Sequence, residues 1–355
     1  MKIIKQLSFL LLITLFVVNP AFSQENPAPL KNKKVDSKII KKVPKEETKP
    51  PSKLMKATEQ VDLSGCWQNS FGSIVLLSHD LNTGEITGKY SSTTGSSGVY
   101  YVRGYTNPDA SENNFPVGLT IPWRTIVRDT DATKLDNSQY WTSIMSGNYV
   151  TSRNSLALMN VISSAIAFKE VGITESGNYP ESLEFKKLSS DNNPCKKNIK
   201  PDSAYYNGFA DENTRKALSD ALTLGNSYWV APHSLLKESS FEIGFDAIID
   251  KEGLKEFAHI TGQIIALNNG KPLQYEFIGE ASYLTKEKKA TLSIAYKAND
   301  GNVISLSGVL NVSNAQKPTL ELLEVNSQGI TDIGAIYMAN RMTNLTFVPK
   351  TSIHK

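Results

Sequence analysis

Four residues near the start of the first folded region have side chains that could hold a small ligand by hydrogen bonds. They are Asn69, Ser73, Tyr90 and Ser92, and they lie in the two blocks Leu63–Ser73 and Thr87–Gly95. We expect the two blocks to form neighbouring β-segments. Polar groups spaced this closely on strands are useful only where they converge on something buried and polar. The pattern therefore predicts a ligand pocket ahead of any catalytic site.

The chain begins with a segment typical of a secretory signal peptide. Lys2 and Lys5 precede an apolar run from Leu7 to Val18, and Ala21–Ser23 offers small residues for cleavage. The run is too short and wrongly flanked for a membrane anchor, and no later stretch is apolar enough to span a bilayer. We expect residues 1–23 to be a signal peptide and the mature protein to be exported, to a periplasm or out of the cell.

Residues 24–60 are predicted to be a disordered tether rich in Lys and Pro. Residues 31–56 contain no aromatic residue, and such a segment cannot bury enough apolar surface to offset the entropy lost on ordering. A basic arm for an anionic surface, such as phospholipid or a polyanionic glycan, is the alternative to a solvated linker, which we prefer. The net charge of the whole chain, +3, is modest.

The 355 residues are long for one hydrophobic core and fit two domains with extra segments. Residues 61–190 hold short runs rich in Val, Ile, Tyr, Thr and Trp, separated by turn signals such as Asn82–Gly84. Ile86, Gly88 and Tyr90 alternate onto one face of a strand. Regular short strands without helical spacers favour an antiparallel barrel or sandwich.

Residues 191–225 are predicted to be a linker with one short helix, in which Ala217, Leu218, Ala221 and Leu222 form an apolar stripe. Residues 226–350 are predicted to be a second β-rich domain. Its expected strands are 241–249, 256–266, 273–284, 289–297, 303–311, 319–325, 331–337 and 343–349. About eight strands in consecutive hairpins suit an up-and-down barrel, although a curved open sheet or a sandwich would give the same pattern.

Residues 63–188 resemble the avidin and streptavidin family. The matching residues are Gly65, Cys66, Trp67, Asn69, Gly72, Ser73, Thr87, Gly88, Tyr90, Ser92, Gly95, Trp123, Ser146 and Gly147. In that family an eight-stranded antiparallel barrel holds biotin at one open end, and such a barrel is just wide enough for one small ligand. The implied fold class is all-β: an eight-stranded up-and-down barrel, one short helix, and a second β-rich meander domain that also suits a barrel.

The resemblance implies polar contacts with the urea of biotin. Asn69, Ser73 and Tyr90 would donate hydrogen bonds to the ureido carbonyl oxygen. Three donors aimed at one acceptor stabilise the negative charge that builds on it in a water-poor site. Ser92 would accept a hydrogen bond from a ureido N–H.

The resemblance also implies a loop that closes over the ligand and apolar side chains that form the walls of the pocket. Thr94 and Gly95 would belong to the loop that closes over the ligand. Phe71 and Trp123 would be apolar walls, and Ser143 would lie near the thioether sulfur.

The sequence also departs from the family at its aromatic residues. Met145 stands where the family has a Trp within Thr-x-Trp-Ser-Gly, and a second family Trp has no match in Leu156–Val161. In the family, one Trp reaches into the binding pocket of a neighbouring subunit, and Phe168 stands at that position in this sequence. The last strand usually gives an Asp or Asn to the other ureido N–H, but Gly172–Gly177 aligns poorly and that residue is left unassigned.

These departures predict weaker binding than the family's best, or a ligand of different shape. Met and aliphatic side chains offer less rigid apolar area than indoles, and each ~2.8 kcal/mol lost lowers affinity by about two powers of ten. Trp141 lies four residues before Met145, so both face inward on one strand. Trp141 is therefore a candidate for an indole nearer the rim of the pocket.

The two cysteines, Cys66 and Cys195, are predicted to form a disulfide in an oxidising compartment. Because Trp67 should point inward, Cys66 points outward at the start of the first strand. A closed barrel places its last strand beside its first, and Cys195 follows that last strand closely. The bond would pin the inter-domain segment to the barrel wall.

We therefore expect an exported, non-enzymatic protein that binds biotin or a biotin-like compound as its ligand. Two cysteines and four scattered His give no metal site, and we expect no cofactor, nucleic-acid partner or transmembrane segment. Family members form dimers or tetramers, which implies a homo-oligomer, although the second domain and Phe168 put the tetramer in doubt. The alternatives are an envelope or interaction protein that keeps the barrel only as a scaffold, and an enzyme acting through the C-terminal domain.

Overall fold

The protein is described by a computed structural model, which covers fourteen stretches of the chain. These are residues 61–92, 98–107, 114–123, 141–169, 172–189, 194–195, 212–224, 228–232, 240–246, 258–268, 271–284, 286–299, 301–328 and 340–350. The expected signal peptide, the tether, Thr94 and Gly95 lie outside the described residues. No helix within these stretches has the length and apolar character needed to cross a membrane.

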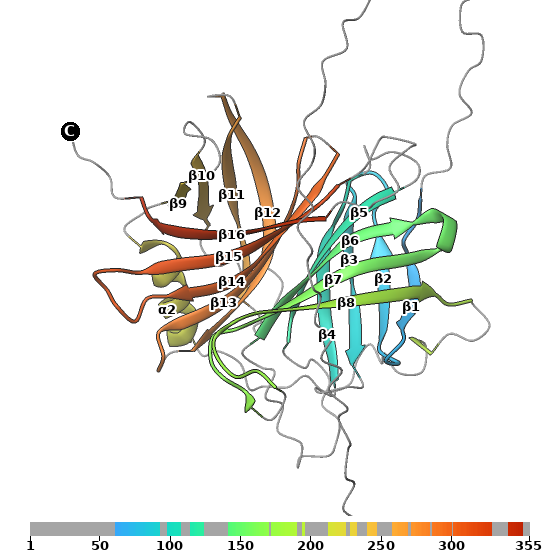
Figure 1. Ribbon diagram of the computed structural model, residues 1–355, viewed down its shortest axis with the longest axis horizontal. Coiled ribbons are helices and arrows are strands. Elements are labelled where there is room, and N and C mark those ends of the chain that lie inside the picture. The colour runs from blue at the N-terminus through green and yellow to red at the C-terminus, as the bar shows by residue number, and fades with distance from the viewer. Residues whose placement is uncertain are drawn as a thin grey trace, which may run out of the picture. The chain divides into compact units, whose positions relative to one another are not determined.

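The first half of the described chain is a closed antiparallel barrel of eight strands (Figure 1). The strands are β1 (Gly65–Asn69), β2 (Ile74–His79), β3 (Glu85–Ser92), β4 (Gly98–Thr106), β5 (Asn114–Pro122), β6 (Trp141–Val150), β7 (Ser155–Ser164) and β8 (Gly177–Lys187), with the 3₁₀ turn η2 (Thr151–Arg153) before β7. Each strand pairs with the next, and β8 closes the barrel on β1 through pairs such as Asn69 with Phe185. The predicted up-and-down barrel is confirmed.

The second half is another closed barrel of eight antiparallel strands, preceded by a helix. The elements are α2 (Glu212–Leu222), β9 (Trp229–Pro232), β10 (Ser240–Phe245), β11 (Ala258–Asn268), β12 (Lys271–Leu284), β13 (Lys289–Lys297), β14 (Val303–Asn311), β15 (Thr319–Ser327) and β16 (Asn340–Pro349). The barrel closes where β16 pairs with β9. Of the three architectures left open by the sequence, the structure has the barrel.

One strand of the second barrel was not expected from the sequence. Trp229–Pro232 forms β9 and supplies the closing strand, whereas the expected strand at 331–337 falls outside the described residues. Four residues that end in Pro give a weak strand signal, because Pro cannot donate to a sheet ladder. The pairing of β9 with both β10 and β16 overrides that weak local preference.

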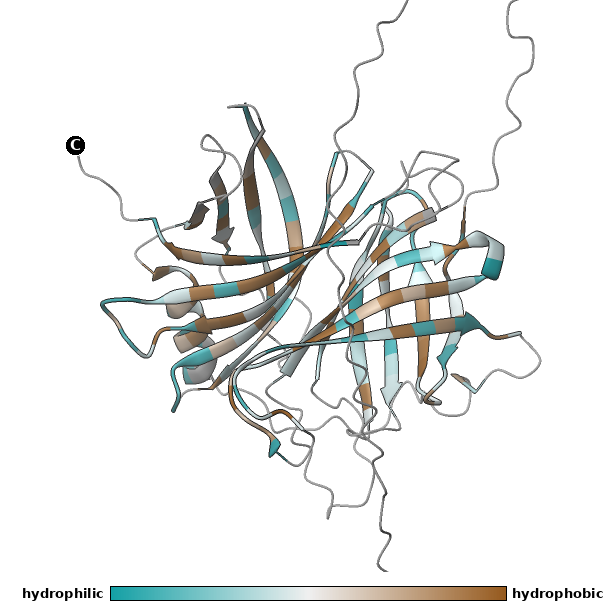
Figure 2. Cartoon of the chain, viewed as in Figure 1, coloured by the Kyte–Doolittle hydropathy of each residue, from teal (hydrophilic) through white to brown (hydrophobic). Residues whose placement is uncertain are grey.

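Alternation of apolar and polar residues builds both barrels, as the hydropathy colouring of the strands shows (Figure 2). In the first barrel the inward positions of β1 to β3 include the buried Trp67, Val75, Ile86 and Tyr90. In the second barrel the apolar core includes Leu218 and Leu222 of α2. Trp229 Nε1 donates to Leu222 O over 2.9 Å, which ties the helix to β9. The apolar face of α2 thus packs against the side chains that fill the second barrel.

The predicted disulfide is confirmed between Cys66 and Cys195, whose Cα atoms lie 6.0 Å apart. Both cysteines are buried against Ile74 and Val99 on the outer side of β1, β2 and β4. The bond holds the segment that follows β8 against the barrel wall. This agrees with the predicted outward direction of the Cys66 side chain.

A face formed by β5, β6 and β7 of the first barrel packs against β12 to β15 of the second. The hydroxyls of Ser146 and Ser327 lie 2.8 Å apart, and those of Ser163 and Ser307 lie 2.6 Å apart. Apolar contacts beside them come from Ile144, Val161, Leu323 and Val325. This outer face of the first barrel is therefore covered by the chain's own second barrel.

Candidate ligand-binding pocket

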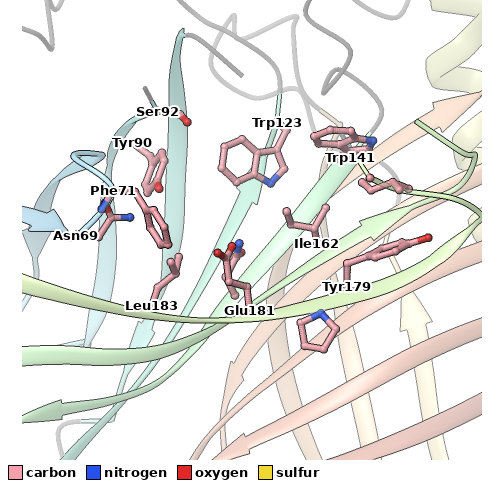
Figure 3. Close-up of a pocket in the computed structure, with 14 residues that line it drawn as sticks. Asn69, Phe71, Tyr90, Ser92, Trp123, Trp141, Ile162, Tyr179, Glu181 and Leu183 are labelled. Atoms are coloured by element: carbon pink, nitrogen blue, oxygen red, sulfur yellow. The ribbon is translucent and has the colours of Figure 1, made fainter. Parts of the chain in front are cut away.

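A cavity of about 410 Å³ opens within the first barrel (Figure 3). Its lining comes from five strands and three connections: Asn69, Phe71, Tyr90, Ser92, Trp123, Trp141, Asn160, Ile162, Gly172, Ile173, Tyr179, Pro180, Glu181 and Leu183. This volume is in the range of small-molecule sites, which combine apolar walls with a few placed polar groups. Of the residues predicted for the pocket, Asn69, Phe71, Tyr90, Ser92, Trp123 and Trp141 are brought together here.

Asn69 ends β1, and its side chain is fixed by the turn to β2. Its Oδ1 accepts the backbone N–H groups of Phe71 at 3.1 Å and of Ser73 at 2.9 Å. Gly72, which lies within this turn, has φ of +84°, a conformation that glycine adopts without strain. Because the amide is planar and its oxygen is committed to the backbone, the Nδ2 group is left as the donor that Asn69 offers to the cavity.

Tyr90 is the second donor, and its environment keeps the hydroxyl protonated. Burial raises the pKa of Tyr90, and the neighbouring Glu181 carboxylate acts in the same direction, while Ser73 and Asn69 beside the hydroxyl oppose the rise. The ring packs edge-to-face on Trp123 at 5.6 Å and on Phe185 at 6.2 Å. Tyr90 can therefore donate a hydrogen bond from a rigid position.

Trp123, which directly follows β5, forms a fixed aromatic wall. Its Nε1–H donates to Ser143 Oγ at 2.5 Å, and its ring lies 5.0 Å from that of Tyr100. The backbone N–H of Trp123 donates to Trp141 O at 3.1 Å, which extends the β5–β6 pairing to the rim. Two donors and one rigid wall thus converge on one space inside an eight-stranded barrel.

Residues 57–154 match the Avidin family. The predicted resemblance is thereby confirmed over the strands that bear Asn69, Tyr90 and Trp123. A search of curated proteins found no match to the chain. The family match and the closed barrel together support a biotin-like ligand-binding protein in general.

Four further residues that were expected at the ligand do not line the cavity of the avidin-like barrel. Ser143 is fully buried, and its hydroxyl is engaged by Trp123 rather than turned to the cavity. Phe168 packs edge-to-face on Trp141 with ring centroids 5.0 Å apart. Met145 lies in the barrel core, and Ser73 sits beside Tyr90. Each touches or neighbours a lining residue, so each can position the site without forming its surface.

Trp141 begins β6 and lines the cavity of the avidin-like barrel together with Tyr179 and Ile173. Its side chain is 6% exposed, and its indole Nε1 has no hydrogen-bond partner within the described structure. Phe168 pairs with Ile173 through backbone bonds of 2.7 and 3.1 Å, which folds the β7–β8 connection over this side. The indole therefore presents an unused donor close to the cavity.

The lining residues that come from β7, β8 and their connection were not predicted from the sequence. Gly172–Gly177, where the last strand was sought, precedes β8, which begins at Gly177. The alternation of Leu183 and Phe185 as inward residues could have revealed the correct strand, since it places Glu181 on the same face. In the segment without a counterpart of the second family Trp, Asn160 is the residue that lines the cavity.

The described residues offer no group of three or more His, Cys, Asp or Glu side chains able to hold a metal ion. Among the described residues that line the cavity, Glu181 is the only one that can carry charge at neutral pH. The arrangement is suited to holding an uncharged polar group by hydrogen bonds between aromatic walls.

Proposed function

We propose that the avidin-like barrel binds biotin or a related cyclic urea, without catalysing a reaction. The observation that supports this most directly is the convergence of the Asn69 amide and the Tyr90 hydroxyl in a cavity of about 410 Å³. Both groups come from the segment that matches the Avidin family. A carbonyl oxygen placed between them would receive two donors in a space bordered by Trp123 and Phe71.

The chemistry of this site is electrostatic rather than catalytic. Asn69 and Tyr90 are held before the ligand arrives, so little entropy is lost in orienting them. Hydrogen bonds to a urea oxygen polarise the ring, so the urea N–H groups become better donors. Ser92, which is buried at the end of β3 and lines the same cavity, would accept one of them.

We also propose that the protein is exported, as residues 1–23 predict. The Cys66–Cys195 disulfide supports this, because such bonds persist mainly in oxidising compartments. The Avidin family suggests self-association, but the β5–β7 face of this barrel is covered by the second barrel. A dimer of this chain would therefore use a different face of the avidin-like barrel.

Calorimetric titration of the mature protein with biotin tests the proposal. We expect saturable binding that is abolished by combining Asn69→Ala with Tyr90→Phe. Thr87→Ala is the matched control, because Thr87 lies on the same strand as Tyr90 but is exposed on the outer face. Absence of both heat and thermal shift at millimolar biotin would instead favour the scaffold alternative, in which the barrel no longer binds a ligand.

A further inference from the structure

Two polar side chains lie on the inner face of β15 in the second barrel. Leu320 and Leu322 of this strand belong to the barrel core, and side chains alternate between the two faces of a strand. The unbroken pairing of β15 with β16 continues this alternation, so Glu324 and Asn326 are directed inward as well. The residues between them pack against the first barrel. Glu324 and Asn326 are 5% and 9% exposed, so an apolar core contains a carboxylate and an amide.

Arg341 of β16 forms a polar cluster with these two residues. It is paired with Asn326 across the two strands, and its Nη2 donates to Glu324 Oε1 over 3.1 Å. The two charges balance, so the cluster of Glu324, Asn326 and Arg341 has no net charge. The Arg341 side chain is 56% exposed, whereas that of Glu324 is 6% exposed. The cluster therefore extends from the barrel interior to solvent.

The Asn326 amide points to a ligand, because its Oδ1 is buried and has no hydrogen-bond partner in the described structure. A buried acceptor without a donor is uncommon in proteins and carries a desolvation penalty. The neighbouring Arg341 bonds to Glu324 instead. Apolar residues of similar volume often stabilise a core as well as a buried ion pair does, or better. Stability of the barrel alone therefore does not account for these three residues.

The cluster lies towards the end of the second barrel that is remote from α2. The helix is tied to Trp229, which pairs with Pro349 at the end of β16. Arg341 is near the start of that strand, about 26 Å from Pro349 at about 3.3 Å per residue. The helix is therefore held at the opposite end of the barrel from the polar cluster.

Aromatic side chains share the inner layer of the barrel with the cluster. The pairing runs from Asn326 to Ile304 of β14, and from Ile304 to Tyr296 of β13. Two strand spacings place Tyr296 about 10 Å from Asn326. The ring of Tyr296 is buried, and its centroid lies 5.4 Å from that of Tyr275 on β12. Flat apolar area and hydrogen-bonding groups thus lie within the span of one small ring-shaped ligand.

We propose that the cluster of Glu324, Asn326 and Arg341 binds a neutral sugar, a pyranose ring with adjacent hydroxyl groups. A hydroxyl group both donates and accepts hydrogen bonds. One hydroxyl would donate to Asn326 Oδ1 while its neighbour accepts from Arg341, and hydrogen bonds to charged groups are the stronger ones. The C–H face of the sugar would pack towards Tyr275 and Tyr296. Because the cluster has no net charge, a neutral ligand leaves no charge unpaired.

This site is separate from the cavity of the avidin-like barrel and does not rest on the proposed function. Saturation-transfer NMR on the mature protein tests it with methyl β-D-glucopyranoside, methyl β-D-galactopyranoside and methyl α-D-mannopyranoside. We expect saturable, millimolar binding of at least one of these sugars. The variant that combines Asn69→Ala with Tyr90→Phe should bind it equally well. No binding of any of the sugars at about 50 mM would overturn the proposal.

Two substitutions in the cluster locate the bound sugar. Asn326→Leu keeps the approximate volume but removes the acceptor, and should weaken binding about tenfold or more. Arg341→Lys keeps the charge beside Glu324 but loses the planar array of donors, and should also weaken it. Asn344→Leu is the matched control, because Asn344 is exposed on the outer face of β16 and should not affect binding. Unchanged affinity in both cluster variants would overturn the site.

The charge of the ligand is tested with D-glucosamine and D-glucuronate. We expect neither charged sugar to bind more tightly than the preferred neutral one, because Glu324 and Arg341 already neutralise each other. Binding of a charged sugar alone would overturn the assignment of a neutral ligand.

The stability of the free protein gives a measurement that needs no ligand. Asn326→Leu should leave the free energy of unfolding unchanged or raise it, because it removes a buried acceptor that has no partner. Urea denaturation of wild type and variant measures this, and it also shows that the variant used for the sugar titrations is folded. A marked loss of stability would mean that Asn326 serves the fold, and would overturn its role in binding.

Discussion

Trp123 Nε1 donates a hydrogen bond of 2.5 Å to Ser143 Oγ, which joins the end of β5 to β6 at the wall of the cavity. Both side chains are almost fully buried. We therefore predict that Ser143, which was expected near a ligand atom, instead supports the Trp123 indole. This distinction can be tested, because a support and a contact respond differently to truncation.

Ser143→Ala should lower the free energy of unfolding by about 1–3 kcal/mol, because it leaves the Trp123 indole N–H buried without an acceptor. The measurement is urea denaturation without ligand, followed by tryptophan emission. Ser78→Ala, on the exposed side of β2, is the control and should have little effect. If Ser143→Ala reduced ligand affinity with no change in unfolding, Ser143 would be a ligand contact instead.

Ionisation of the buried Tyr90 hydroxyl should lower the stability of the avidin-like barrel at alkaline pH. Burial raises the pKa of Tyr90, so the unfolded chain loses this proton at lower pH than the folded chain does. Below about pH 10 both states are protonated and the group has no effect; above it, the unfolded state is favoured and stability falls. Tyr90→Phe should remove this contribution.

The test is denaturation of wild type and Tyr90→Phe at pH 8 and at about pH 10.5. Tyr105, Tyr149 and Tyr283 also have raised pKa values, so part of the alkaline loss remains in the variant. The difference between the two proteins should widen in favour of the variant as pH rises. A pH dependence identical in both proteins would contradict the role of the buried hydroxyl.

The disulfide should contribute about 2–5 kcal/mol, because Cys66 and Cys195 are separated by 129 residues and the bond restricts a long loop of the unfolded chain. Replacing both cysteines by Ser should therefore lower stability, and the loss should match that of the wild type under reductant. Counting the free thiols by mass spectrometry checks whether the Cys66–Cys195 bond is present in each sample. Two free thiols in the non-reduced protein would contradict the bond.

The sequence predicted the first barrel well because each strand has its own signal. Alternating residues and turn signals mark strands such as β3. The outward direction of Cys66 and the place of Cys195 just after the last strand were together enough to predict the disulfide. The sequence predicted the β8 side of the pocket poorly. Asn160 is a polar residue at an inward position, and inward positions are recognised by apolar character. Only the pairing of β7 with β8 shows that Asn160 and Glu181 meet in the cavity.

The last prediction concerns the packing between the two barrels, which no local sequence pattern predicted. Gly118 of β5 faces the second barrel, and a Cβ at this position would lie 2.5 Å from Ser305 Oγ and 2.6 Å from Val303 Cγ1. These distances are too short for real contacts. We therefore expect Gly118→Ala to lower the free energy of unfolding by about 1–3 kcal/mol.

The cause of that loss can be isolated because the backbone at Gly118 is not among the glycines with positive φ, so Ala is conformationally allowed. Ser305→Ala should cost little alone, since its buried hydroxyl has no hydrogen-bond partner in the described structure. It should recover part of the stability lost in Gly118→Ala, and denaturation of the four proteins of the double-mutant cycle measures this coupling. Strict additivity of the two changes would mean that the barrels do not press together at Gly118 in solution.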